Sequence, residues 1–256
     1  IKKGTILNTI PYKGMTCQFR TCYSIELLPV SIDSIAISQW NRHSSPEPGG
    51  NWNAQAVLTL NLKSLSGLTF AEFECSKLRI YLNGTPLSYR LYKLIGNDVS
   101  RIEVSSDNNP NTLSNKKSGT RHFLSEKNIR PVGFDADEGL VPFPENSFTG
   151  YRLLQEFFAF PEKFLFYDID LKSSVQSFPS ERFLSLHLYL KEMPGFAGEI
   201  TKNHFALGCT PIVNLFDMDA VPVLTNPAKS RYRIIPKIGK PEQYEIYSVN
   251  KVEATD

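Results

Sequence analysis

Alternation of apolar and polar residues runs through most of the chain and predicts β-strands. The clearest segments are 58–62 (LTLNL) and 184–190 (LSLHLYL), where leucine occupies every second position. This period of two is typical of a strand with one buried face. Weaker alternation predicts further strands at 4–7, 17–27, 32–39, 78–83, 101–105, 165–171, 232–235 and 244–249. The fold class is therefore mainly β, with two short helices.

The first helix is predicted near residues 86–95. Thr85 is a typical N-cap residue, and Pro86 suits the first turn because its missing N–H has no partner there anyway. Gly96 stands where a glycine often follows the end of a helix. The apolar residues that recur at helical spacing between these signals are Leu87, Leu91, Leu94 and Ile95.

The segment 150–171 (GYRLLQEFFAFPEKFLFYDIDL) predicts a helix near 149–159, a corner and a strand. The helix should end before Pro161, which cannot donate a backbone hydrogen bond and restricts the residue before it. We expect the apolar residues of this segment to form a core, so that Phe158→Asp would unfold the protein. The predicted core residues are Tyr151, Leu154, Phe157, Phe158, Phe160, Pro161 and Phe164.

A polar stretch, residues 106–119 (SDNNPNTLSNKKSG), divides the chain. It predicts either a long surface loop or the connection between two domains. The similarity of LTLNL to the later LSLHL fits two β-sandwich-like units in tandem, although so short an echo also arises by chance in β proteins. We predict a first domain at 1–118, with the helix near 86–95, and a second at 119–256, with the helix near 149–159.

Charge and composition exclude several classes of protein. The 28 basic and 26 acidic residues give a net charge of +2, which favours neither nucleic acid nor an anionic membrane as partner. No apolar run approaches the roughly 18 to 20 residues of a membrane span, and the first residues lack the apolar region of a signal peptide. The chain also begins without methionine, so we expect an excised piece of a longer soluble protein. The scattered cysteines, predicted as buried thiols in a reducing cytoplasm, are Cys17, Cys22, Cys75 and Cys209.

Catalytic motifs are missing from the sequence. The four histidines are isolated, and no zinc-protease, nucleophile-elbow or phosphate-loop motif occurs. His204 and Cys209 are the only pair resembling a base and a nucleophile, and we interpret them as a strand-end histidine and a buried thiol. The acidic residues at 135–138 and 168–170 are interpreted as a solvated loop and a polar strand end rather than calcium or glycosidase sites. We therefore predict no enzymatic activity, no cofactor and no metal.

A basic run lies near the C-terminal end, with no acidic residue inside it. Its members are Lys229, Arg231, Arg233, Lys237 and Lys240. Three interpretations remain open: a nucleic-acid stripe, a solubilising face of an edge strand, or a contact with an acidic partner protein. On a nearly neutral chain the nucleic-acid interpretation is the least favoured.

Four stretches resemble the TssF (VasA/ImpG) family of the bacterial type VI secretion system. They are residues 19–29 (FRTCYSIELLP), 131–138, 150–166 and 208–216, and they follow the family's order. The third is the most specific, because it is similar to the family's YRLLQEYFAFPEKF segment. Within the first, serine and leucine replace the usual proline and tryptophan. The resemblance identifies the chain as the central part of a TssF-like protein.

The resemblance implies a structural, non-enzymatic role. TssF-like subunits build baseplate wedges with TssG, TssK and TssE around the VgrG hub, and the wedges support assembly of the sheath and tube. It implies a cytoplasmic location in a Gram-negative bacterium, docked at the inner-membrane complex, with no nucleic acid, membrane insertion or small-molecule substrate. Because the matched motifs predict core packing, we place candidate protein interfaces elsewhere. These are the loops 43–53 and 106–119, with Trp52, and the basic residues Lys229, Arg231, Arg233 and Lys237.

A carbohydrate-binding β-sandwich module is the alternative function. The chain is 12% aromatic, and such a module needs two or three coplanar exposed rings. Trp40, Trp52 and Tyr189 are the candidates for that platform.

Overall fold

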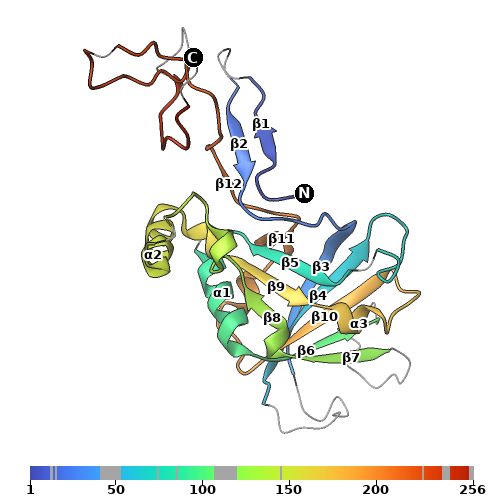
Figure 1. Cartoon of the computed structure of the whole chain (residues 1–256). Coiled ribbons are helices and arrows are strands. Elements are labelled where there is room, and N and C mark those ends of the chain that lie inside the picture. Colours follow the sequence, from blue (N-terminus) through green and yellow to red (C-terminus); the bar gives the residue numbers. More distant parts are fainter. Residues whose placement is uncertain are drawn as a thin grey trace.

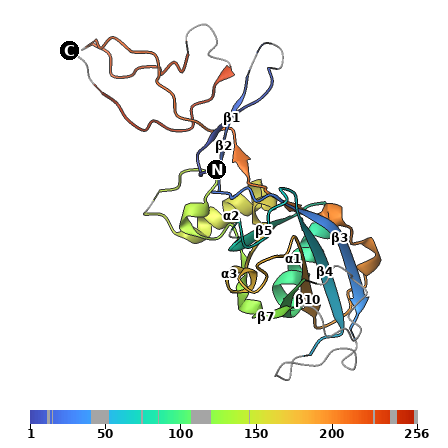
Figure 2. The same cartoon turned by 90° about the vertical axis from the view of Figure 1, so that its right-hand side faces the viewer.

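The computed structural model is mainly β, which confirms the predicted fold class (Figure 1). Two larger sheets pack together, and a small third sheet projects from them beside the C-terminal segment (Figures 1 and 2). Within the described residues no helix is long and apolar enough to cross a membrane. The structure describes residues 1–11, 14, 16–40, 53–73, 75–84, 86–106, 120–144, 146–226, 228–237 and 243–253.

The larger sheet is antiparallel and has five strands. In spatial order they are β3 (Val30–Gln39), β4 (Ala56–Ser64), β10 (Phe183–Leu190), β6 (Val99–Ser105) and β7 (Arg121–Ser125). The two leucine segments lie side by side in it. Leu58 is opposite Leu188, and Leu62 is opposite Leu184. Their similarity is accounted for by two neighbouring strands whose leucines line the same side of the main core. The polar residues between these leucines are buried too, so the prediction of a single buried face is wrong for both strands.

The second sheet has four antiparallel strands. In spatial order they are β11 (Phe205–Leu207), β5 (Lys77–Leu82), β9 (Phe166–Asp170) and β8 (Ile129–Pro131). Both sheets draw strands from both sides of the predicted boundary at 118/119, because β10 lies between β4 and β6, and β9 pairs with β5. The boundary therefore runs between segments that are hydrogen-bonded to each other, and the strands are interleaved rather than arranged in tandem.

The main core lies between these two sheets. Alternate residues of β4 and β10 meet alternate residues of β5 and β9 there, as the period of two predicts. Helix α1 (Leu87–Asp98) covers part of the same core with its predicted apolar face. The central residues are Leu58, Leu60, Leu62, Leu78, Ile80, Leu82, Leu91, Ile102, Tyr167, Ile169, Leu186 and Leu188.

Helix α1 differs from the prediction at both ends. Pro86 is the N-cap residue, and Thr85 lies outside the described residues. Gly96 does not end the helix, which continues to Asp98. A β-carbon added to Gly96 would clash with the hydroxyl oxygen of Tyr167, which donates a hydrogen bond to the carbonyl of Tyr92 at 3.0 Å. Gly96 therefore permits a close approach between α1 and β9.

The remaining elements are short. The second predicted helix is confirmed as α2 (Thr149–Ala159), which is followed by the 3-10 turn η4 (Pro161–Phe164) and then by β9. The others are α3 (Lys172–Val175), η2 (Glu126–Asn128), η3 (Ala136–Glu138), η5 (Ala197–Glu199) and η6 (Lys202–His204).

The third sheet joins the N-terminal segment to β12, the last strand of the described residues. Its order is β1 (Ile6–Asn8), β2 (Gln18–Thr21) and β12 (Ile212–Val213). The strands predicted at 232–235 and 244–249 are wrong, since the described residues there form no strand. Alternating side chains do not create a strand without a neighbouring backbone to bond. Among the described residues of this segment, the bond from the amide of Val221 to the carbonyl of Ile235, at 2.9 Å, is not part of a ladder of backbone bonds.

His187 on β10 is buried between hydroxyl groups of the neighbouring strands. Its Nδ1 lies 2.8 Å from the hydroxyl of Thr59, and its Nε2 lies 3.0 Å from that of Ser105. Burial, with a smaller effect from Arg121, lowers the pKa of His187 to about 4. The imidazole is therefore neutral in the folded protein at pH values where the unfolded chain already binds a proton.

This difference predicts a pH-dependent free energy of unfolding. Because the unfolded chain takes up the proton first, stability should fall as the pH drops from about 6.5 to about 4, by up to about 3 kcal/mol. Urea unfolding at several pH values measures it. The His187→Gln variant should lose less stability over this window than the parent, and identical pH profiles would contradict the assignment.

The contact between Gly96 and Tyr167 predicts an unusual effect of alanine. Gly→Ala inside a helix ordinarily stabilises it by up to about 1 kcal/mol. At Gly96 the added methyl group displaces the Tyr167 hydroxyl, so we expect a net loss of about 1–3 kcal/mol. Urea unfolding measures the change, with Gly198→Ala as control because open space surrounds that position. A stabilised Gly96→Ala protein would show that α1 and β9 are not so close.

Candidate protein interface

Helix α2 turns its charged side toward the protein and its aromatic side toward solvent. Tyr151, Leu154 and Phe158 are 64%, 57% and 81% exposed, whereas Arg152 and Glu156 are only 5% and 4% exposed. The helix was predicted at the correct position but with the opposite face inward. The assignment of Tyr151, Leu154 and Phe158 to the core is therefore wrong.

The neighbouring aromatic residues divide between surface and interior. Phe157 and Phe160 are also exposed, which corrects their assignment to the core, and Phe148 before the helix joins them at the surface. Phe164 is buried as predicted and packs against Phe134, with ring centroids 5.0 Å apart. The chain enters the interior only after Pro161, the half-buried residue that begins η4.

Arg152 holds α2 to the loop before it through three consecutive carbonyl groups. Its guanidinium donates to the carbonyls of Phe134 at 3.2 Å, Asp135 at 2.9 Å and Ala136 at 2.8 Å. The planar group with several fixed donors suits such a row of acceptors. One turn further along α2, Glu156 Oε2 lies 3.8 Å from Arg152 Nε.

Glu156 and Lys163 form a buried ion pair beneath α2. The Lys163 ammonium, which is fully buried, donates to Glu156 Oε2 at 2.5 Å and to the carbonyl of Glu138 at 3.0 Å. The other carboxylate oxygen of Glu156 accepts the backbone N–H of Leu140 at 2.7 Å. We call Arg152, Glu156 and Lys163 the ion cluster. Together they attach α2 and η4 to residues 134–140.

The loop that receives the ion cluster is itself ordered. Glu138 Oε2 accepts the backbone N–H groups of Gly133 at 2.6 Å and Asp135 at 3.1 Å. Gly133 has a φ of +106°, and a side chain there would lie 3.1 Å from both the carbonyl of Lys163 and the hydroxyl of Tyr23. That hydroxyl donates to the Lys163 carbonyl at 3.1 Å. Only glycine fits this conformation and this space.

Burial sets the electrostatics of the cluster. Removal from water lowers the pKa of Lys163, while the hydrogen bond and charge of Glu156 act in the opposite direction. A charge in such a place is tolerated because its partners remain in contact with it. Turning α2 to bury its aromatic side would separate these partners, so the ion cluster fixes which side of the helix meets solvent.

The basic residues predicted as an interface are exposed, but they do not form an edge strand. Lys229, Arg231, Arg233 and Lys237 lie in the C-terminal segment outside the sheets. Trp52 and most of the loops 43–53 and 106–119 lie outside the described residues.

The platform required for carbohydrate binding is not formed by the two rings that the structure describes. Trp40 and Tyr189 are buried and pack edge to face, with centroids 5.7 Å apart and planes at 85°. Trp52, the third candidate, lies outside the described residues. The carbohydrate-binding alternative is not favoured.

The other candidate chemical groups have structural partners. His204 accepts a hydrogen bond from the backbone N–H of Thr201 at 3.0 Å in a capping box. Cys209 lies 3.6 Å from the carbonyl of Leu207, and burial raises its pKa. Among the described residues, no three His, Cys, Asp or Glu side chains are placed to hold a metal ion together.

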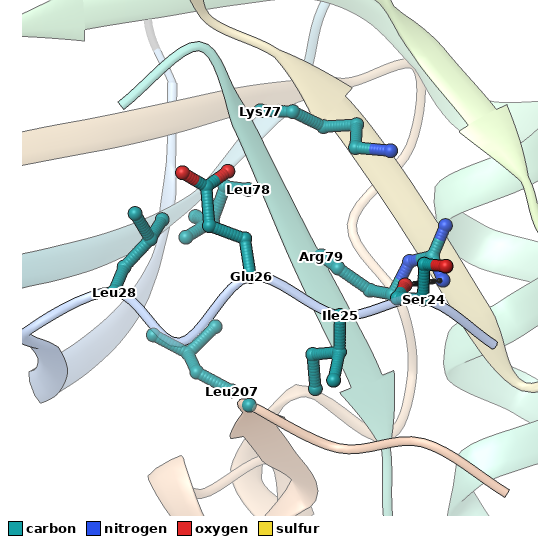
Figure 3. Close-up of a pocket in the computed structure, with 9 residues that line it drawn as sticks. Ser24, Ile25, Glu26, Leu28, Lys77, Leu78, Arg79 and Leu207 are labelled. Atoms are coloured by element: carbon teal, nitrogen blue, oxygen red, sulfur yellow. Dashed lines mark hydrogen bonds between the residues drawn. The ribbon is translucent and has the colours of Figure 1, made fainter. Parts of the chain in front are cut away.

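A cavity of about 300 Å³ lies between residues 24–28 and β5 (Figure 3). Its cations are already neutralised: Arg79 makes two hydrogen bonds to Asp168, at 2.6 and 2.7 Å, and Lys77 lies 3.1 Å from the same carboxylate. Burial alone would raise the pKa of Asp168, but these two partners outweigh it and lower the pKa. The cavity therefore offers no unpaired cation from β5 to a ligand.

The ion cluster predicts a large stability loss when one member is removed. Lys163→Met leaves the Glu156 carboxylate buried without its main partner and should lower the free energy of unfolding by about 3–5 kcal/mol. Combining it with Glu156→Gln should restore part of the loss, because no unpaired charge remains. Urea unfolding measures both. Lys202→Met, at an exposed site, is the control and should change the free energy of unfolding only slightly. An effect of Lys163→Met as small as that of the control would refute the arrangement.

Comparison with known proteins agrees with the resemblance found in the sequence. The family model "Type VI secretion system, TssF" matches residues 1–256. The type VI secretion system component TssF1 of Pseudomonas aeruginosa is 27% identical in an alignment of 250 positions, and the match covers 94% of this chain and 38% of TssF1.

A solved structure shares the fold. A chain in the cryo-electron microscopy structure of the TssK–TssF–TssG baseplate subcomplex of the type VI secretion system superposes with a TM-score of 0.69 and 23% identity. The match covers 94% of this chain and 42% of that one. The chain thus spans about two fifths of the length of these relatives. Because the family model matches its whole length, the chain belongs to the TssF family of the type VI secretion system.

Proposed function

We propose that this chain is a structural part of the type VI secretion baseplate, where it supports wedge assembly through protein–protein contacts for sheath and tube assembly. Family membership supports the proposal. The structural observation that carries it is the aromatic side of α2, which the ion cluster holds toward solvent. An apolar surface held rigidly in water is typical of a protein interaction site.

The proposed partners are other baseplate proteins. TssG and TssK have direct support, because the solved relative with the same fold is part of a TssK–TssF–TssG subcomplex. TssE and the VgrG hub are included on the resemblance to the family. The proposed location is the cytoplasmic side of the inner membrane, where the baseplate docks onto the membrane complex.

The role that we propose is non-enzymatic. A scaffold needs surfaces held at fixed positions relative to one another, and the described part of this chain supplies them. Strands from both halves interleave in both larger sheets, and α2 leads through η4 into β9. A load on α2 is therefore passed to the sandwich through a buried ion cluster and a continuous chain segment.

Co-expression tests the scaffold proposal. The full-length protein carrying an affinity tag should capture TssG and TssK from the same cell, and the complex should stay together through size-exclusion chromatography. A tagged, unrelated cytoplasmic protein is the control for nonspecific capture. If the full-length protein retained neither subunit, even at low salt, the proposal would be contradicted.

A further inference from the structure

We propose that the exposed side of α2 docks into an apolar groove on a different subunit of the baseplate complex. The inference rests on the proposed scaffold function and assigns one contact site to it. We call this surface the α2 face. Its residues are Phe148, Tyr151, Leu154, Phe157 and Phe158.

The spacing of the α2 face suits a helix that inserts into a groove. Tyr151, Leu154 and Phe158 stand at positions i, i+3 and i+7, the spacing of anchor residues in helix-in-groove recognition. Four aromatic rings of the face pack edge to face in two pairs. Phe148 meets Tyr151 at 84° and Phe157 meets Phe158 at 77°, so neither pair forms a flat platform. Such an uneven surface suits a concave apolar partner better than a flat one.

The area of the α2 face is sufficient for a specific contact. Its five side chains are 51–81% exposed. Since a large apolar side chain buries roughly 150–250 Å² when covered, they offer about 600 Å² of apolar surface. This is at the upper end of the roughly 300–600 Å² patches seen on monomers, and it approaches the ~800 Å² that each partner contributes to a standard interface.

The α2 face carries no formal charge, which constrains its partner. Arg152 and Glu156 are the only charged residues within α2, and both point inward and are hydrogen-bonded there. A charged groove would lose its hydration against the aromatic rings without gaining an opposite charge. The groove must therefore be apolar and uncharged where the helix lies.

A different subunit fits this face better than a second copy of the chain. Two α2 faces packed together would bury about 1,200 Å² in total, the lower limit for a specific interface. A groove contacts the flanks of the helix as well as its crest and buries more. Helix α2 also lies at the periphery of the sandwich in both views, where a groove can reach it (Figures 1 and 2).

The ion cluster lowers the cost of docking. Arg152, Glu156 and Lys163 hold α2 in one orientation before any partner arrives. Binding therefore does not have to order the helix, and less of the contact energy is lost.

Two matched substitutions in the full-length protein test the proposal by co-expression with TssG and TssK. Leu154→Asp alters the α2 face, and Leu65→Asp alters a similarly exposed leucine, 65% exposed, in the turn after β4. Phe158→Asp is a second variant in the face. We expect both α2 variants to capture at least about tenfold less of one subunit, while Leu65→Asp captures as much as the parent. Their Tm values should stay within about 3 °C of the parent.

The possible outcomes separate this proposal from the scaffold proposal. Undiminished capture by both α2 variants overturns docking through α2. The scaffold function then rests on family membership and on the capture of the subunits by the parent. If the parent captures neither subunit, the scaffold function fails. If the α2 variants capture both subunits but no longer associate with a second copy of themselves, the occupant of the face is a second copy. A Tm lowered by well over 3 °C in both α2 variants shows that the face is covered within the polypeptide itself, and these last two results also overturn the proposal.

Discussion

The orientation of α2 depends on a buried ion pair. Turning the helix to bury its aromatic side would separate these charges from their partners. Lys163 is fully buried against Glu156, while Arg152 binds three carbonyl groups in the preceding loop. Removing either charge from its partner costs several kcal/mol, because the other charge is left buried and unpaired. The backbone carbonyl and N–H groups that meet this side of α2 would also lose their hydrogen bonds if the helix turned.

The same cluster connects the interface to the rest of the fold. Lys163 lies in η4, which leads directly into β9, and β9 lies between β5 and β8 in the four-stranded sheet. The carbonyl of Lys163 also accepts a hydrogen bond from the hydroxyl of Tyr23, in the N-terminal segment. The proposed docking surface is thus attached to the core through buried residues. This arrangement would give the proposed scaffold a fixed contact geometry.

The strands could be predicted because the apolar core on one side of a sheet imposes a period of two on the leucines, as in LTLNL and LSLHL. That the polar residues between them are buried as well could not be predicted from the alternation. The position of α2 was also predictable, since Pro161 cannot continue a helix. Its orientation was not, because periodicity shows that a helix has two different sides without showing which side finds partners. The one sequence signal for the buried side was the pair Arg152 and Glu156, one turn apart. Their hydrogen-bond partners in the loop become visible only in three dimensions. The interleaving of strands likewise depends on long-range pairing that local pattern does not encode.

Thiol labelling of a Phe158→Cys variant in the folded full-length protein tests the central claim most directly. With the charged side of α2 inward, the added thiol should react about as fast as a thiol on an unfolded chain. It should become protected when the baseplate partner binds. Labelling of the free protein only at the rate of global unfolding would show that the aromatic side faces the interior, and would contradict the account.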